Sequence, residues 1–160
     1  MTTATEVSLK VGDKAPEFTL ASSAGENISL KDLKGKSVIL YFYPKDDTPG
    51  CTKEACDFRD KSKEFEKMNA AILGVSFDDL DSHGKFVRKY QLPFPLLSDE
   101  KKEVAKAYGV HKLKSFLGKS YWGIERTTFW IDPQGKIARI CPKAKVENHI
   151  PEILEAIREK

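Results

Sequence analysis

Short apolar runs alternate with amphipathic segments along this chain, a pattern typical of a domain in which strands and helices alternate. The strongest strand pattern covers residues 37–43 (SVILYFY), between Gly35 and Pro44. A second buried strand is expected over residues 70–77, and the intervening residues 51–67 carry apolar side chains at helical spacing. This strand, helix, strand unit predicts an α/β fold with the first run near the centre of a sheet.

Weaker patterns predict the other strands and the last helix. Residues 16–20 and 28–30 indicate short strands around a turn of serine, alanine and glycine. Residues 127–132 and 136–141 flank a Pro-Gln-Gly turn and predict a hairpin. A helix with one apolar face is expected from Asn148 onward.

Two more helices are expected in the middle of the chain. Ser82 is the expected N-cap of a helix that reaches Tyr90, and Asp99 the expected cap of one that ends at Gly109. The expected order of elements is therefore βαβα(β)αββα. The pattern leaves open how residues 111–123 fold.

Length and composition limit the class of protein. A chain of 160 residues fits a single domain, and 40% hydrophobic with 32% charged residues is typical of a globular protein. Disordered, collagen-like and coiled-coil chains are excluded. The longest stretch without a charge has nine residues, whereas a bilayer span needs about 20, so no membrane segment is expected.

The net charge of +3 arises from 27 basic and 24 acidic residues without a long run of one sign, so nucleic acid is not the expected partner. Residues 101–119 do hold six lysines, which fit a solvated face or a docking surface for an acidic partner. The first ten residues (MTTATEVSLK) lack the features of a secretory signal, so the cytoplasm is the expected compartment.

Of the three cysteines, Cys51 has the most informative surroundings, because it follows a Pro-Gly pair between a predicted strand and a predicted helix. The unsatisfied N–H groups and the dipole of a helix N-terminus favour an anion by about 0.3–2 kcal/mol. Cysteine thiols in such places ionise more readily than their ordinary pKa of about 8.5 implies. Cys51 is therefore a candidate nucleophile, and the alternative is an inert buried thiol.

Cys56 lies five residues further along the same predicted helix, in a C-x4-C rather than a C-x-x-C spacing. Five residues of α-helix separate two Cα atoms by about 8 to 9 Å, whereas a disulfide requires about 7 Å or less. If Cys51 and Cys56 pair, the first turns of the helix must therefore unwind. The alternative for Cys56 is a small side chain in the core.

The segment PKDDTPGCTKEACDFRD resembles the peroxiredoxins, specifically the bacterioferritin comigratory protein or peroxiredoxin Q group. The family pattern P-x-x-x-T-x-x-C is met by Pro44, Thr48 and Cys51, and the group's second cysteine by Cys56. The segments VGDKAPEFTL, GVSFDDLDSHGKF, LPFPLLSD, AYGV and ERTTFWIDPQGKI extend the resemblance over nearly the whole chain. It implies a thioredoxin-like fold, with a central mixed β-sheet flanked by helices, and a thiol peroxidase.

By this resemblance Cys51 is the peroxidatic cysteine, whose thiolate attacks hydrogen peroxide or an alkyl hydroperoxide and becomes a sulfenic acid. Thr48 and Arg126 would donate hydrogen bonds to the reacting oxygens, and Arg126 would also keep the thiolate ionised. Pro44 would shield the site from water. Arg59, eight residues from Cys51, is the alternative to Arg126.

Cys56 would then be the resolving cysteine, which attacks the sulfenic acid to form a disulfide within the chain. The resemblance implies recycling by thioredoxin or a similar dithiol reductant, and a monomer. No metal, haem or flavin is required. The three histidines show no ligand spacing, so surface or capping roles are expected for them.

Two matters stay open. The Cys51–Cys56 disulfide could instead switch a redox sensor or chaperone-like module. Sustained turnover would distinguish an enzyme from such a sensor. A thioredoxin-like reductase is disfavoured because C-x-x-C is absent.

Preference for small or bulky hydroperoxides depends on how residues 111–123 fold over the site. Cys141, at the end of a predicted strand, is expected to be a structural thiol.

Overall fold

The computed structural model describes residues 9–142 and 149–158. Its elements are, in chain order, β1 (Thr19–Ala21), β2 (Asn27–Ser29), the 3-10 helix η1 (Leu30–Leu33), β3 (Ser37–Phe42), α1 (Pro49–Lys67), β4 (Ala70–Ser76), α2 (Leu80–Tyr90), β5 (Leu96–Ser98), α3 (Glu103–Ala107), β6 (His111–Phe116), β7 (Lys119–Ile124), β8 (Thr127–Ile131), β9 (Ile137–Cys141) and α4 (His149–Arg158). Within these two stretches of chain, no helix has the length and hydropathy that a bilayer crossing requires.

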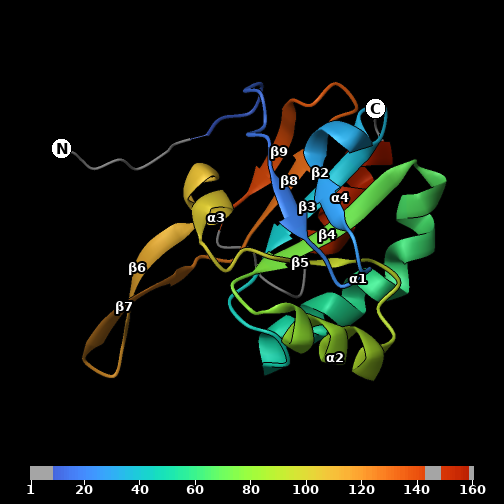
Figure 1. Cartoon of the computed structure of the whole chain (residues 1–160). Coiled ribbons are helices and arrows are strands. Elements are labelled where there is room, and N and C mark those ends of the chain that lie inside the picture. The colour runs from blue at the N-terminus through green and yellow to red at the C-terminus, as the bar shows by residue number, and fades with distance from the viewer. Residues whose placement is uncertain (1–8, 143–148, 159–160) are drawn as a thin grey trace.

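A five-stranded mixed sheet, in the order β5-β4-β3-β8-β9, forms the centre of the fold (Figure 1). The middle strand β3 is parallel to β4 and antiparallel to β8. All six of its residues are buried, because the sheet is covered on both faces, and a continuous apolar run suits such a strand. The predictions of a central strand over 37–43 and of a hairpin over 127–141 are confirmed.

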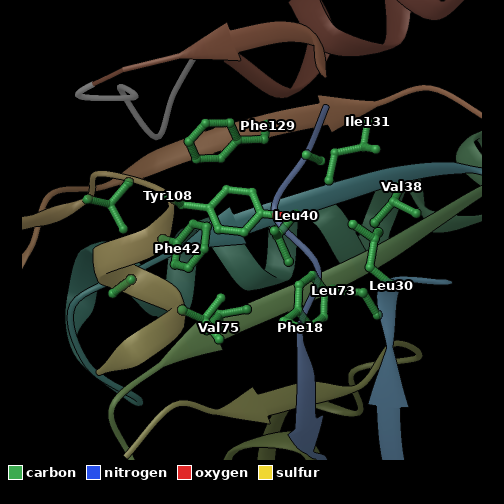
Figure 2. Close-up of a cluster of buried hydrophobic side chains, with 14 of the residues drawn as sticks. Phe18, Leu30, Val38, Leu40, Phe42, Leu73, Val75, Tyr108, Phe129 and Ile131 are labelled. Carbon is green, nitrogen blue, oxygen red and sulfur yellow. The ribbon is translucent and has the colours of Figure 1, made fainter. Parts of the chain in front are cut away.

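Side chains of β3 alternate between two hydrophobic clusters. Leu40 and Phe42 face the cluster shown in Figure 2, which includes residues of α3 and of the segment before β1. Ile39 and Tyr41 face the opposite cluster, to which α1, α2 and α4 contribute. Cys51 belongs to this second cluster, so its environment is determined by the packing of α1 on the sheet.

Residues 111–124, where the sequence pattern left the structure open, form the β6–β7 hairpin. It is a separate two-stranded sheet that extends away from the central sheet in Figure 1. Leu117 and Gly118, with φ of 52° and 78°, form its turn. Except for the buried Ile124 at its root, the large apolar residues of this hairpin are exposed, so they show none of the regular alternation that a half-buried strand has.

The helix boundaries differ from the expected ones in detail. Asp79, not Ser82, is the N-cap of α2, and its side chain accepts a hydrogen bond from the Ser82 N–H. Lys102, not Asp99, is the N-cap of α3, although the Asp99 carboxylate accepts from the N–H groups of Val104 and Ala105 at 3.2 and 2.8 Å. That helix ends two residues before Gly109. The expected start of the last helix, Asn148, lies outside the described residues.

Candidate active site

The first turn of α1 carries Cys51. Thr48 is the N-cap, and Pro49 is the first helical residue, where proline is suitable because its missing N–H has no partner there. The helix therefore begins two residues before the expected 51–67. Its first internal bond runs from the Thr52 N–H to the Thr48 carbonyl, over 2.8 Å. The N–H groups before Thr52, including that of Cys51, lie at the positive end of the helix dipole.

Arg126 binds the sulfur of Cys51. It lies between β7 and β8, and its Nη2 donates to Cys51 Sγ over 3.3 Å. Cys51 is only 2% exposed, so this bond is sheltered from water, and solvent ions screen the attraction between the guanidinium and the sulfur only weakly. Gly50 permits the close approach, because a Cβ atom there would lie 3.2 Å from Nη2.

Glu54, one turn along α1, binds the other side of the guanidinium. Arg126 Nη1 donates to Glu54 Oε1 over 2.5 Å, and Glu54 is fully buried. Burial opposes the charge of Arg126, but Glu54 and Cys51 outweigh it and raise the pKa of Arg126 above its usual value. Sequence reasoning missed Glu54 because most helical glutamates are exposed, and no local pattern marks this one as buried.

Thr48 and Pro44 lie on the loop that joins β3 to α1. The Thr48 hydroxyl donates to the Lys45 carbonyl over 2.9 Å, so its hydrogen is used within the loop. Pro44 is half-buried directly after β3. Of the residues named from the sequence, the fold thus brings Cys51 and Arg126 into direct contact and holds Thr48 and Pro44 on the preceding loop.

Cys56 is half-buried and, like Cys51, a free thiol. Both cysteines lie within the continuous helix α1. Regular helical geometry places their Cα atoms about 8 to 9 Å apart, beyond the reach of a disulfide. The described form is therefore the one in which the two thiols are held apart by the helix.

Arg59, the alternative partner for Cys51, binds the end of α2 instead. Its Nη1 donates to the Tyr90 carbonyl over 2.8 Å. The same turn of α2 binds the loop before α1, since the Asp47 carboxylate accepts from Lys89 Nζ at 2.8 Å and from the Tyr90 hydroxyl at 2.9 Å. These bonds lower the pKa of Asp47. Arg126, rather than Arg59, is the arginine at the Cys51 sulfur.

Asp46 joins the same loop to the first half of α2. Its carboxylate accepts from the Tyr43 hydroxyl at 2.5 Å and the Ser82 hydroxyl at 2.8 Å, and it is hydrogen-bonded to His83 Nδ1 at 2.7 Å. His83 Nε2 donates to the Leu97 carbonyl over 2.9 Å. Both nitrogens of this fully buried ring are therefore engaged in hydrogen bonds. The expectation of a surface or capping role is therefore wrong for His83.

Asp46, Asp78 and His83 also have the composition of a metal site, since their ligand atoms lie within 4.8 Å of one another. Hydrogen bonds already engage these atoms. Asp78 Oδ2 accepts from the Ser76 hydroxyl at 2.6 Å and from the Asp46 N–H at 2.9 Å. The cluster is thus accounted for as a hydrogen-bond network that fixes the loop before α1.

Cys141 is the last residue of β9, directly opposite Thr128 of β8. It is half-buried against the cluster under α4. Burial raises the pKa of the Cys141 thiol, which keeps it protonated and a poor nucleophile. This environment agrees with the expected structural thiol.

Known proteins resemble this chain over most of its length. The AhpC/TSA family model matches residues 11–140. The chain is 55% identical to a putative peroxiredoxin bcp of Coxiella burnetii, over 92% of this chain and 98% of the relative. It is 48% identical to peroxiredoxin Bcp of Bacillus subtilis, over 96% and 98%.

The fold of this chain also closely resembles those of solved structures. A cysteine-to-serine mutant of Xylella fastidiosa PrxQ matches with a TM-score of 0.90 at 35% identity, over 96% of this chain and 98% of that one. The Xanthomonas campestris bacterioferritin comigratory protein, in a study of its alkyl peroxide reduction activity, matches with a TM-score of 0.84 at 40% identity, over 89% and 90%.

Proposed function

The chain belongs to the AhpC/TSA family, and from this membership we propose the catalytic cycle and the partners of its thiol peroxidase activity. It is a peroxiredoxin with the predicted thioredoxin-like fold. The contact between the Arg126 guanidinium and the Cys51 sulfur, at the positive end of α1, carries the proposal. It supports Cys51 as the peroxidatic cysteine, because a sheltered thiolate beside a fixed cation is the nucleophile that the reaction requires.

In the first step the Cys51 thiolate attacks one oxygen of a hydroperoxide. A sulfur–oxygen bond forms while the O–O bond breaks, and the leaving hydroxide or alkoxide takes a proton to become water or an alcohol. Negative charge grows on the leaving oxygen, so donors already fixed around it stabilise the transition state. We assign this role to Arg126, the Cys51 N–H and the Thr48 hydroxyl, which would turn from the Lys45 carbonyl to the peroxide. Glu54 would position Arg126, and Pro44 would limit access of water.

In the second step the Cys56 thiolate attacks the sulfenic sulfur of Cys51, which forms the disulfide and releases the oxygen as water. Because both thiols lie in one continuous helix, the first turns of α1 unwind for this step. Thioredoxin or a similar dithiol then reduces the disulfide by exchange and supplies the two electrons of the cycle.

Further parts of the proposal concern the setting of the reaction. Resolution within one chain needs no second subunit, which supports a monomer that acts as one domain. The cycle also needs thiols that stay reduced between encounters with peroxide, which supports a cytoplasmic location.

A coupled assay tests this function. Peroxide, thioredoxin, thioredoxin reductase and NADPH are combined with the wild type and with Cys51→Ser, Cys56→Ser and Cys141→Ser. We expect continuous NADPH consumption by the wild type and by Cys141→Ser, no peroxide consumption by Cys51→Ser, and a single oxidation by Cys56→Ser. Only one oxidation by the wild type, with an intact reductant system, would indicate a sensor rather than an enzyme.

A further inference from the structure

The β6–β7 hairpin exposes an unusual amount of apolar surface. Seven large hydrophobic side chains are exposed in the described part of the chain, and five of them belong to this hairpin: Leu113, Phe116, Leu117, Tyr121 and Trp122. Their exposed fractions range from 48% to 90%. Exposed apolar and aromatic side chains gathered on one short element indicate an interaction surface, whereas single scattered ones are the rule on protein surfaces.

The strand register distributes these side chains over two faces. Leu113 lies opposite Trp122 on one face, where the His111 ring contacts the Trp122 ring at 5.2 Å between centroids. On the other face Lys114 lies opposite Tyr121, and next to them Phe116 lies opposite Lys119. One face is therefore mainly apolar, while the other combines rings with ammonium groups.

The charge of the hairpin has one sign. Residues 111–124 include three lysines, Lys112, Lys114 and Lys119, and no carboxylate. Two lysines of the α3 region extend this charge to the root of the hairpin: the pKa of His111 is lowered by burial and then by Lys106 and Lys102. Two copies that met through this hairpin would oppose like charges without compensation. A partner with carboxylates around an apolar patch would be complementary.

The root of the hairpin lies beside the active site. The Glu125 N–H donates to the Val110 carbonyl over 2.8 Å and closes the root, and Lys114 Nζ donates to the Ile124 carbonyl over 2.9 Å. Two residues after Ile124 comes Arg126, which contacts Cys51. A protein bound to the root of the hairpin is therefore next to the site where the disulfide forms.

We propose that the β6–β7 hairpin is the docking surface for the protein dithiol reductant, a partner whose contact face is apolar and edged with carboxylates. This inference rests on the proposed function, which requires such a reductant. One thiolate of the bound dithiol attacks a sulfur of the Cys51–Cys56 disulfide and forms a mixed disulfide. The second thiol of the reductant then attacks this mixed disulfide. The reductant dissociates in its own disulfide form, and Cys51 and Cys56 are both thiols again.

The test compares a protein reductant with a small one. The Leu113→Ser, Trp122→Ser double variant and the Lys114→Glu, Lys119→Glu double variant are assayed with thioredoxin, its reductase and NADPH, and separately with dithiothreitol, which needs no docking surface. Val11→Ser is the control for the apolar change, since Val11 is 63% exposed outside the hairpin. Lys36→Glu, before β3, is the control for the charge change.

We expect both hairpin variants to raise the KM for thioredoxin by about tenfold or more, as truncation of an interface hot spot does. Turnover with dithiothreitol and the single-turnover formation of the disulfide should equal those of the wild type, which also shows that the variants are folded. Trp122→Phe should keep most of the wild-type KM. The two controls should behave as the wild type with both reductants.

Three results would overturn the docking proposal. One is an unchanged KM for thioredoxin in both hairpin variants. A second is equal loss of activity with thioredoxin and dithiothreitol. The third is a wild-type dimer that the hairpin variants dissociate in sedimentation, which would assign the surface to a second copy. Failure of the proposed function is distinct, because the wild type itself would then fail to turn over with dithiothreitol.

Discussion

The Arg126 guanidinium lies between the Cys51 sulfur, which must be negatively charged to react, and the buried Glu54 carboxylate. We predict that Arg126→Ala slows the attack of Cys51 on hydrogen peroxide by about 10²-fold or more, the usual cost of removing a preorganised donor. Stopped-flow fluorescence measures the attack.

A control separates this effect from loss of folding, because Arg126→Ala removes the ion-pair partner of the buried Glu54 carboxylate, a change that costs about 3–5 kcal/mol of stability. Glu54→Gln keeps the arginine and nearly the same side-chain shape. It should fold and lose less of the rate than Arg126→Ala. Equal rates in Arg126→Ala and the wild type would move the role of Arg126 to another residue.

His83 is the second residue whose removal has a defined effect. His83→Leu leaves the Asp46 carboxylate without its imidazole partner and the Leu97 carbonyl without a donor, so we expect the free energy of unfolding to fall by about 3 kcal/mol or more. Urea denaturation followed by circular dichroism measures it.

The ion pair between Lys89 of α2 and Asp47 of the loop before α1 is exposed, and its removal provides the comparison for His83→Leu. Lys89→Ala removes a surface ion pair with Asp47 and should lower the free energy of unfolding far less than His83→Leu does. Similar losses in His83→Leu and Lys89→Ala would contradict the importance given to the buried network.

Single residues also show what sequence reasoning can reach. Cys51 could be chosen because its neighbours along the chain, the Pro-Gly pair and the following helix, create its environment. Arg126 required the family resemblance, since nothing within the segment ERTTF distinguishes an arginine that binds a thiol from one that faces solvent. Glu54 and His83 were missed because their burial arises only from tertiary packing, to which their local patterns give no clue.

At the scale of elements, α1 is the part that must change between the reduced and the disulfide form. We predict that backbone amides of about residues 49–57 lose protection from hydrogen exchange when peroxide converts the protein to the disulfide. The middle of β3 and the amides of α2 should stay protected, because hydrogen bonds from Asp46, Asp47 and Arg59 continue to join α2 to both ends of the changing segment.

Hydrogen exchange with mass spectrometry on reduced and oxidised protein tests this change. Cys56→Ser, treated with the same peroxide, is the matched control, since it cannot form the disulfide and should retain the protection of the reduced form. Unchanged protection in a verified disulfide form would show that the two cysteines pair without unwinding of α1.

Elements differ in how well their sequence predicts them. β3 and α4 bury regular apolar patterns, and both were anticipated in type and approximate position. The β6–β7 hairpin buries little of its own apolar surface, so the physical cause of a periodic pattern is missing there. The caps of α2 illustrate a finer limit: Asp79 and Ser82 are both good cap residues, and only tertiary contacts assign Ser82 to Asp46.

At the scale of the molecule, the sheet explains why residues 75 positions apart share one site. β3 and β8 are antiparallel, with Phe42 opposite Thr127. The carboxyl end of β3, which leads to Cys51, therefore lies beside the amino end of β8, which Arg126 precedes. Strand pairing of this kind follows from the topology of the whole chain, and local pattern alone did not supply it.

Once Cys51 is a sulfenic acid, unwinding of α1 competes with the reaction of a second peroxide molecule. While the helix stays folded, the Cys51 sulfenic acid cannot reach Cys56, and a second peroxide can oxidise it to sulfinic acid. Once the helix unwinds, the Cys56 thiol of the same chain reacts without a diffusional encounter, at a high effective concentration.

We predict that the wild type forms the disulfide, and little sulfinic acid, at peroxide concentrations that convert Cys56→Ser to the sulfinic form at Cys51. Intact mass and peptide mapping distinguish the products, and Cys141→Ser should match the wild type because its thiol lies at the end of β9 in the other half of the chain. Rapid sulfinic formation in the wild type at modest peroxide would mean that unwinding is slower than a second oxidation, and that Cys56 does not protect Cys51.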